Sequence, residues 1–114
     1  MEHSDSRELF SALANHSRLS IVQLLRGQMS TVSQIAENLG FEQSRVSHSL
    51  ARLQRAGIVG CRWEQKRKMF YLADEIMPLL RDVEAYVQRR SKVAIGMERG
   101  SRGWNAAAWA TARE

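Results

Sequence analysis

The sequence contains a single cysteine, Cys61, among its 114 residues. One cysteine cannot form a disulfide within the chain, and it excludes a zinc site built from several thiolates of one chain. A glycine-rich phosphate loop is also lacking. The three histidines lie on different predicted elements, so no nucleophile and base are brought together. These absences predict a protein that is not an enzyme and that uses no cofactor.

Long apolar runs are absent as well, because no stretch approaches the roughly 18 residues that a membrane span needs. Residues 1–6 have neither the basic flank nor the apolar segment of a secretion signal. We therefore expect no membrane partner and a cytoplasmic location.

Acidic residues are fewer than basic ones, with 12 Asp and Glu against 17 Lys and Arg and a formal net charge of +5. An excess of cations favours a polyanionic partner through phosphate contacts and counterion release. The same balance also serves solubility, so the positions of the cations along the chain must decide between the two.

The spacing of the apolar residues predicts a mainly α fold with a small β-hairpin, about five helices and a two-stranded wing. Ser4 or Asp5 is expected to cap the first helix. A second helix is expected from about Ser17, with Gly27 as its C-terminal cap.

A short third helix is predicted between the N-cap Thr31 and the terminating Gly40. A longer fourth helix begins two residues later and runs to about residue 56, with Gly57 as its stop. A short helix, a glycine-containing turn and a longer helix form the helix-turn-helix pattern. The predicted buried stripe of the fourth helix consists of Val46, Leu50 and Leu53.

Two strands are predicted at 58–63 and 69–72, because both segments are rich in residues that favour strands. Residues 64–68 between them are polar and charged. This segment is expected to form an exposed loop with a basic tip, which would serve as the wing.

The side of the fourth helix opposite its apolar stripe carries hydroxyl, imidazole and guanidinium groups and no acidic residue. Such groups contact base edges and phosphates, and a cationic hairpin next to the helix would add backbone or minor-groove contacts. A basic but merely solvated surface is the alternative for the helix alone, and the basic hairpin favours double-stranded DNA. The predicted DNA-binding residues are Gln43, Ser44, Arg45, Ser47, His48, Arg52, Lys66, Arg67 and Lys68.

The fifth helix has an apolar stripe that runs from residue 76 to residue 87, further than a small core requires. Left exposed, this stripe would be a large hydrophobic patch, so it predicts a homodimer. Two-fold pairing would set the recognition helices about 34 Å apart and predicts an inverted-repeat operator. The predicted dimerisation residues are Leu9, Phe10, Leu79, Leu80, Val83, Tyr86 and Val87.

Residues 1–95 are therefore expected to form one domain for DNA binding and dimerisation. Residues 96–114 contain three glycines and few residues that would define a core. We expect them to form a flexible C-terminal tail.

The run Gln43-Ser44-Arg45-Val46-Ser47-His48 and the segments 13–19, 49–53 and 56–59 resemble the ArsR/SmtB family of winged-helix repressors. The resemblance spans about residues 9–87. It implies a winged helix-turn-helix fold, operator binding as a homodimer, and relief of repression by an inducer.

Two departures from this family concern the inducer. Where the family's thiolate metal site falls, the third helix has residues 31–33, which are Thr, Val and Ser. At the family's other metal site only Asp74 matches, because Glu75 and Val87 replace histidines and Arg90 replaces a carboxylate. The resemblance therefore implies that both metal sites are absent and leaves the inducer unknown: a metal ion, an oxidant, a small organic ligand or no ligand.

Two other functions stay open at this point. Cys61 fits a small core residue, and its alternative role is a thiol-based redox sensor acting through an intersubunit bond or a reversible cap. A winged helix can also serve as a protein-protein interaction module, which would show neither steep salt dependence nor preference for one DNA site.

Overall fold

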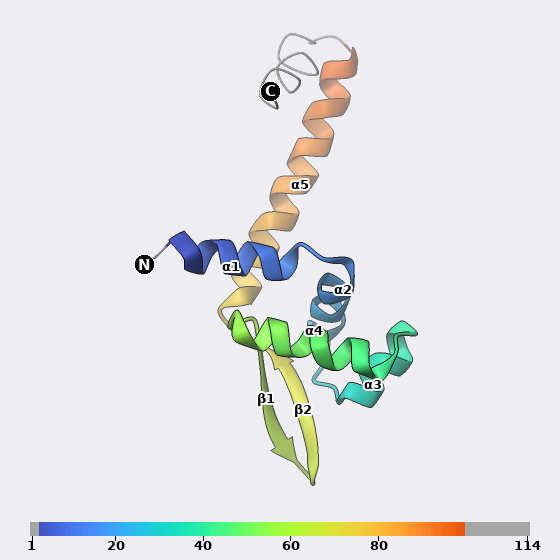
Figure 1. Ribbon diagram of the computed structural model, residues 1–114. Coiled ribbons are helices and arrows are strands. Elements are labelled where there is room, and N and C mark those ends of the chain that lie inside the picture. Colours follow the sequence, from blue (N-terminus) through green and yellow to red (C-terminus); the bar gives the residue numbers. More distant parts are fainter. Residues whose placement is uncertain (1–2, 100–114) are drawn as a thin grey trace. The chain divides into compact units, whose positions relative to one another are not determined.

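The computed structural model describes residues 3–99 of the chain (Figure 1). Five helices and one antiparallel hairpin occur in this part of the chain, which confirms the predicted fold class. In chain order the elements are α1 (His3–Leu13), α2 (His16–Leu25), α3 (Val32–Leu39), α4 (Gln43–Arg55), β1 (Val59–Glu64), β2 (Arg67–Leu72) and α5 (Ile76–Arg99).

The chain divides into two units, residues 1–77 and residues 78–114. The first unit holds α1 to α4, the hairpin and the first residues of α5. The second unit holds the rest of α5. The predicted tail at 96–114 falls partly on this helix, which continues to Arg99, and its residues 100–114 lie outside the described part.

The core of the first unit lies where α2, α3 and α4 meet the base of the hairpin. Ile21, Val22 and Ile35 are fully buried there, together with the predicted stripe of α4. That stripe is confirmed, because Val46 and Leu53 are inaccessible to solvent and Leu50 nearly so. Burial of branched apolar side chains of this kind is the main term that holds such small domains together.

The ends of α2 differ from the prediction by one or two residues. The side chain of Asn15 accepts a hydrogen bond from the backbone N–H of Arg18 at 3.0 Å, so α2 begins at His16 and not at about Ser17. Its C-cap is Arg26 in a right-handed conformation, and Gly27 does not adopt the left-handed one. The prediction of Gly27 as the cap was therefore wrong, because the helix ends without a left-handed residue.

The predicted helix-turn-helix is present in α3 and α4. Thr31 caps α3 in a capping box, in which Thr31 Oγ1 accepts from the Gln34 N–H and the Gln34 side chain accepts from the Thr31 N–H, at 3.1 and 2.9 Å. Gly40 ends α3 with a φ of 70°, a conformation that disfavours residues with a Cβ. Gly57 ends α4 in the same way with a φ of 78°.

The hairpin is longer, and its turn tighter, than predicted. Its antiparallel register runs from Val59 opposite Leu72 to Glu64 opposite Arg67. Only Gln65 and Lys66 form the turn, and both have positive φ values, of 52° and 66°. Two-residue hairpin turns favour positive φ values, because these values match the twist of the two strands. A positive φ costs a residue other than glycine about 1 kcal/mol. The prediction of a loop at 64–68 was therefore wrong. The sequence did not reveal the two-residue turn, because neither of its residues is glycine or asparagine.

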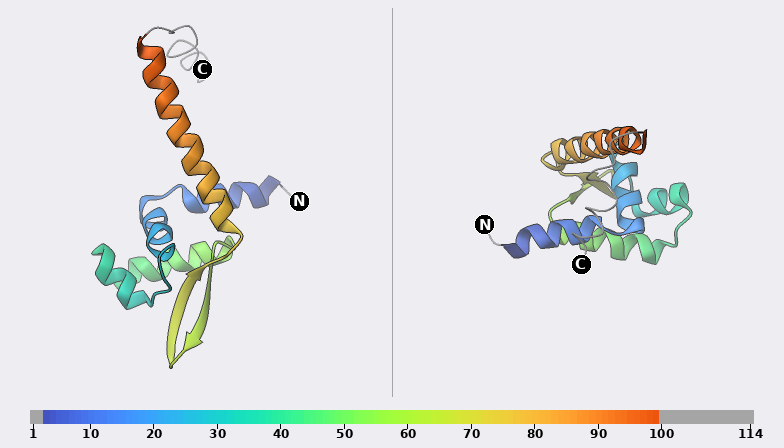
Figure 2. Two further views of the ribbon diagram at one scale, coloured as in Figure 1. Left: turned by 180° about the vertical axis from the view of Figure 1, so that it is seen from behind. Right: turned by 90° about the horizontal axis from the view of Figure 1, so that it is seen from above.

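Figure 2 shows the hairpin from behind, extending away from α2, α3 and α4 with its turn at the far end. Its base is held by a backbone bridge between Ser30 and Phe70, in which each N–H donates to the other's carbonyl oxygen, at 3.1 and 2.8 Å. The segment that leads into α3 is thus tied to the second strand of the wing.

α5 begins at Ile76, and Pro78 lies in its first turn, where its missing N–H has no helical partner to lose. Of the predicted dimerisation residues on α5, Leu80 is buried in the single chain and Leu79 is half-buried. Val83, Tyr86 and Val87 are 46%, 55% and 53% exposed. Within residues 3–99, no helix has both the length and the apolar character needed to cross a lipid bilayer.

The capping box of α3 generates the first prediction. Thr31→Val keeps the volume of the side chain but removes the oxygen that the Gln34 N–H uses, and we expect the free energy of unfolding to fall by about 1 kcal/mol. Urea denaturation followed by circular dichroism measures the change. Glu37→Ala, at an exposed site of the same helix, is the matched control and should change stability by less than about 0.5 kcal/mol. Equal effects of the two substitutions would contradict the cap.

Candidate nucleic-acid interface

The outer surface of the first two turns of α4 is polar and exposed, because burial of the apolar stripe turns the opposite side of the helix to solvent. We call this surface the recognition face. It consists of Gln43, Ser44, Arg45, Ser47 and His48, all of them exposed. Five of the predicted DNA-binding residues are thus brought together on one surface.

Two of these residues are held by side chains from other elements. Gln43 Nε2 donates to Ser33 Oγ on α3 at 3.2 Å, which ties the two helices of the helix-turn-helix together at their N-terminal ends. Arg45 Nε donates to Ser17 Oγ on α2 at 2.8 Å. The guanidinium carbon of Arg45 also lies 3.8 Å from the centre of the Phe41 ring, within cation-π range.

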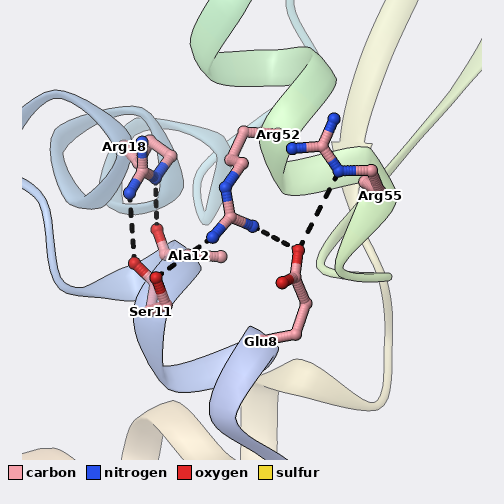
Figure 3. A network of polar contacts seen from close by, with 6 residues as sticks. All are labelled: Glu8, Ser11, Ala12, Arg18, Arg52 and Arg55. Carbon is pink, nitrogen blue, oxygen red and sulfur yellow. Dashed lines mark hydrogen bonds and ion pairs between the residues drawn. The ribbon is translucent and has the colours of Figure 1, made fainter. Parts of the chain in front are cut away.

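Arg52 does not join the recognition face, contrary to its predicted placement. Its guanidinium donates to the carboxylate of Glu8 and, at 3.1 Å, to Ser11 Oγ, both on α1 (Figure 3). Its side chain is only 21% exposed. Helical spacing within α4 predicted that Arg52 lies on a surface without acidic residues. That spacing gives no information about Glu8, because Glu8 belongs to α1.

Figure 3 shows that this contact is part of a wider network between α1, α2 and α4. Arg55 Nε lies 4.0 Å from the same Glu8 oxygen. Arg18 of α2 donates to the carbonyl oxygens of Ala12 and Ser11, at 2.6 and 3.1 Å, in the last turn of α1. The network therefore joins α1 to both α2 and α4.

The wing carries the remaining predicted cations, all of them exposed. Lys66 lies in the turn, whereas Arg67 and Lys68 belong to β2 and not to a loop as predicted. Lys68 Nζ lies 5.7 Å from the centre of the Phe70 ring. Glu64 lies opposite Arg67 in the register. Its carboxylate forms an ion pair with Arg62, with Nη2 and Oε2 2.8 Å apart.

A groove with a volume of about 610 Å³ lies between α3, α4 and β2. Ser47 of the recognition face lines it together with Arg67 and Lys68 of the wing. Hydroxyl and amide groups from Ser33 and Gln54 also line it. Glu37 lines it as well. The groove thus brings one residue of the recognition face and two cations of the wing to a common surface.

Cys61 lies on β1, opposite Phe70 in the register, and is half-buried. Gln54 Nε2 on α4 approaches its Sγ at 3.4 Å. No three His, Cys, Asp or Glu side chains gather into a metal-binding cluster in the part of the chain that the structure describes. The role of Cys61 as a redox sensor remains a prediction.

Sequence reasoning missed five residues that hold predicted DNA-binding side chains in place. Ser17 and Phe41 hold Arg45, and Ser33 holds Gln43. Glu8 and Ser11 hold Arg52. A signal for Phe41 is its place in the turn directly before α4, four residues from Arg45. Ser17 and Glu8 lie 28 and 44 residues from their partners, and only the fold brings them together.

Residues 15–60 match the family described as "Bacterial regulatory protein, arsR family". The HTH-type transcriptional regulator NmtR of Mycobacterium tuberculosis is 48% identical over 48 residues, which cover 42% of this chain and 40% of NmtR. The uncharacterized HTH-type transcriptional regulator MJ1325 of Methanocaldococcus jannaschii is 34% identical over 76 residues, 65% of this chain and 84% of the relative. The chain therefore spans less than half the length of one relative and most of the other.

Among solved structures, the chain is similar to the homodimeric winged helix-turn-helix DNA-binding domain of Mb0332 from Mycobacterium bovis. The TM-score is 0.73 and the identity 26%, over 78% of this chain and 83% of that domain. The two-helix unit and the wing described above are thus those of a winged helix-turn-helix.

The pairing of Arg52 with Glu8 generates the second prediction. Arg52→Met keeps much of the side-chain volume but removes a partly buried ion pair and leaves Ser11 Oγ without this donor. We expect a loss of about 1 kcal/mol in the free energy of unfolding.

Arg55→Met is the matched control, because Arg55 is 67% exposed and only approaches Glu8 at 4.0 Å. Its effect should stay within about 0.5 kcal/mol. Thermal and urea denaturation of both variants provide the measurement. A smaller loss for Arg52→Met than for Arg55→Met would show that the network does not stabilise the fold.

Proposed function

Since this chain belongs to the ArsR family of bacterial regulatory proteins and has the family's winged-helix fold, we propose that it is a homodimeric repressor. In this proposal it binds an inverted-repeat operator in double-stranded DNA, and a signal releases it. Its relatives are transcriptional regulators, which supports a function without catalysis.

One observation carries the proposal: the recognition face and the cations of the wing are all exposed, and Ser47, Arg67 and Lys68 line one groove. A helix of this diameter fits the major groove of B-DNA, which is about 12 Å wide. Ser44, Ser47 and His48 would then meet base edges. Lys66, Arg67 and Lys68 would follow the neighbouring backbone or minor groove and supply phosphate contacts.

The homodimer rests on apolar side chains that the single chain leaves exposed. Val83, Tyr86 and Val87 follow the three-and-four spacing of one helical side on α5, and Phe10 on α1 is 61% exposed. The similar domain of Mb0332 is described as homodimeric. We propose that these residues, with Leu9 and Leu79, form the dimer surface of a domain that spans residues 1–95. Leu80 contributes little because it is already buried.

Selection of duplex DNA tests the proposal directly. From random duplexes the full chain should enrich one inverted repeat whose half-sites lie about 34 Å apart along the axis. Affinity for that site should fall steeply with salt, because each neutralised phosphate contributes about 0.9 to the slope of log K against log salt. Enrichment of no sequence, together with a flat salt dependence, would favour a protein-protein interaction module.

The wing generates a further prediction with a control of equal charge. Lys66→Gln with Lys68→Gln removes four cations from the dimer, so it should lower the salt slope by about 3.6 and weaken binding to all duplexes alike. Arg81→Gln with Arg89→Gln removes the same charge from exposed positions of α5, which carries no residue of the recognition face or wing, and should change the slope by less than one. Equal salt slopes for the two double variants would show that the wing does not contact the DNA.

Dimerisation is tested by sedimentation velocity. The full chain should sediment at twice the chain mass at micromolar concentration, and Val83→Ser with Val87→Ser should shift it toward the monomer, because these changes remove apolar surface from the dimer. Ala85→Ser with Gln88→Ser, on the other side of α5, is the control and should leave the dimer intact. A monomeric parent chain would overturn the homodimer.

A further inference from the structure

Arg45 is unusual among the cations of the interface because its position is set by the protein before any partner binds. Its Nε donates to Ser17 Oγ at 2.8 Å, and its guanidinium lies over the Phe41 ring at 3.8 Å. Phe41 in turn makes a T-shaped contact with the His16 ring, with the ring centres 6.4 Å apart. The side chain is therefore held from the start of α2 and from the turn before α4.

These contacts use one edge and one side of the guanidinium. Among the described residues, no hydrogen bond is recorded for its Nη1 and Nη2 atoms, and the residue is exposed. The remaining edge is a planar fork of donors, which matches two oxygens of a phosphate or carboxylate. Because the rotamer is already fixed, binding an anion there costs less side-chain entropy than at a free arginine.

The position of Arg45 around α4 indicates which anion it meets. Successive residues of a helix are about 100° apart, so Ser44 and His48 point directly away from the buried Val46 stripe, whereas Arg45 lies at its flank. Its contacts with Ser17 place that flank toward α2, and the groove with Arg67 and Lys68 lies on the side toward α3 and β2. A helix seated in a major groove has base edges in front of it and a phosphate backbone on either side.

We infer that Arg45 is a preset phosphate clamp, which binds a backbone phosphate on the α2 side of the recognition helix while the wing binds the opposite side. Phe41 and Ser17 are its positioning residues. This inference rests on the proposed function, since it needs a duplex seated on α4. In this inference Arg45 fixes the register of α4 along the DNA, and Ser44 and His48 contact the base edges.

The test is a double-substitution cycle between protein and DNA on the selected duplex. Each phosphate of one half-site is replaced in turn by an uncharged methylphosphonate, and affinity is measured for the parent chain and for Arg45→Gln. One phosphate should cost the parent about tenfold in affinity and cost Arg45→Gln almost nothing. The salt slope of Arg45→Gln should fall by about two, because both subunits of the dimer lose one phosphate contact.

Arg55→Gln is the matched control, because it removes the same charge from the last turn of the same helix. It should still lose about tenfold at that phosphate. A set of duplexes with 7-deazaguanine, which lacks the N7 acceptor, tests base reading. If the loss in Arg45→Gln is coupled to one guanine N7 and to no phosphate, Arg45 reads a base and the clamp is overturned.

The positioning residues are tested by conservative pairs that leave the charge unchanged. Phe41→Leu should weaken the coupling to that phosphate about two- to fivefold, and Phe41→Tyr should restore it. Ser17→Ala should weaken it as well, and Ser17→Thr should restore it. Thermal unfolding of each variant separates loss of fold from loss of position. Full coupling in Phe41→Leu and Ser17→Ala would show that Arg45 needs no positioning.

The clamp and the proposed function fail in different ways. If the parent chain enriches no duplex, the proposed function fails. If the parent binds one inverted repeat but Arg45→Gln binds it with unchanged affinity and salt slope, only the clamp fails.

Discussion

Burial of the apolar stripe of α4 against α2 and α3 is the constraint on which the rest of the structure depends. Val46 and Leu53 are inaccessible to solvent, and Leu50 is nearly so. Truncation of one such side chain costs several kcal/mol, far more than any surface contact described above. This burial sets the rotation of α4 about its own axis, and so decides that Ser44 and His48 face solvent.

Weaker contacts with residues of other segments decide which side chains on the flank of α4 stay available to a partner. Arg45 and Arg52 lie seven residues apart, two turns along the same flank, yet one is exposed and the other is paired with Glu8. The difference comes from what lies opposite each: a hydroxyl and an aromatic ring for Arg45, and a carboxylate for Arg52. The first keeps its charge available to an external anion, whereas the second uses its charge to hold α1.

Sequence patterns predicted the parts of this fold whose cause is local. The N-cap Thr31 and the helix stops Gly40 and Gly57 depend on residues close in sequence, and all three were predicted in place. The capping box with Gln34 was not predicted. The hairpin turn was mispredicted because Gln65 and Lys66 adopt a conformation for which their side chains give no signal. Ser17, which holds Arg45, and Glu8, which holds Arg52, were missed because they are 28 and 44 residues away in sequence.

The most direct test of the central claim, that the exposed side of α4 meets duplex DNA, is an NMR titration of the isotope-labelled full chain with its selected duplex. The account predicts the largest amide shifts at residues 43–48 and 65–68, and small ones at Glu8 and Arg52. Large shifts confined to α1 or α5, with residues 43–48 unchanged, would contradict it.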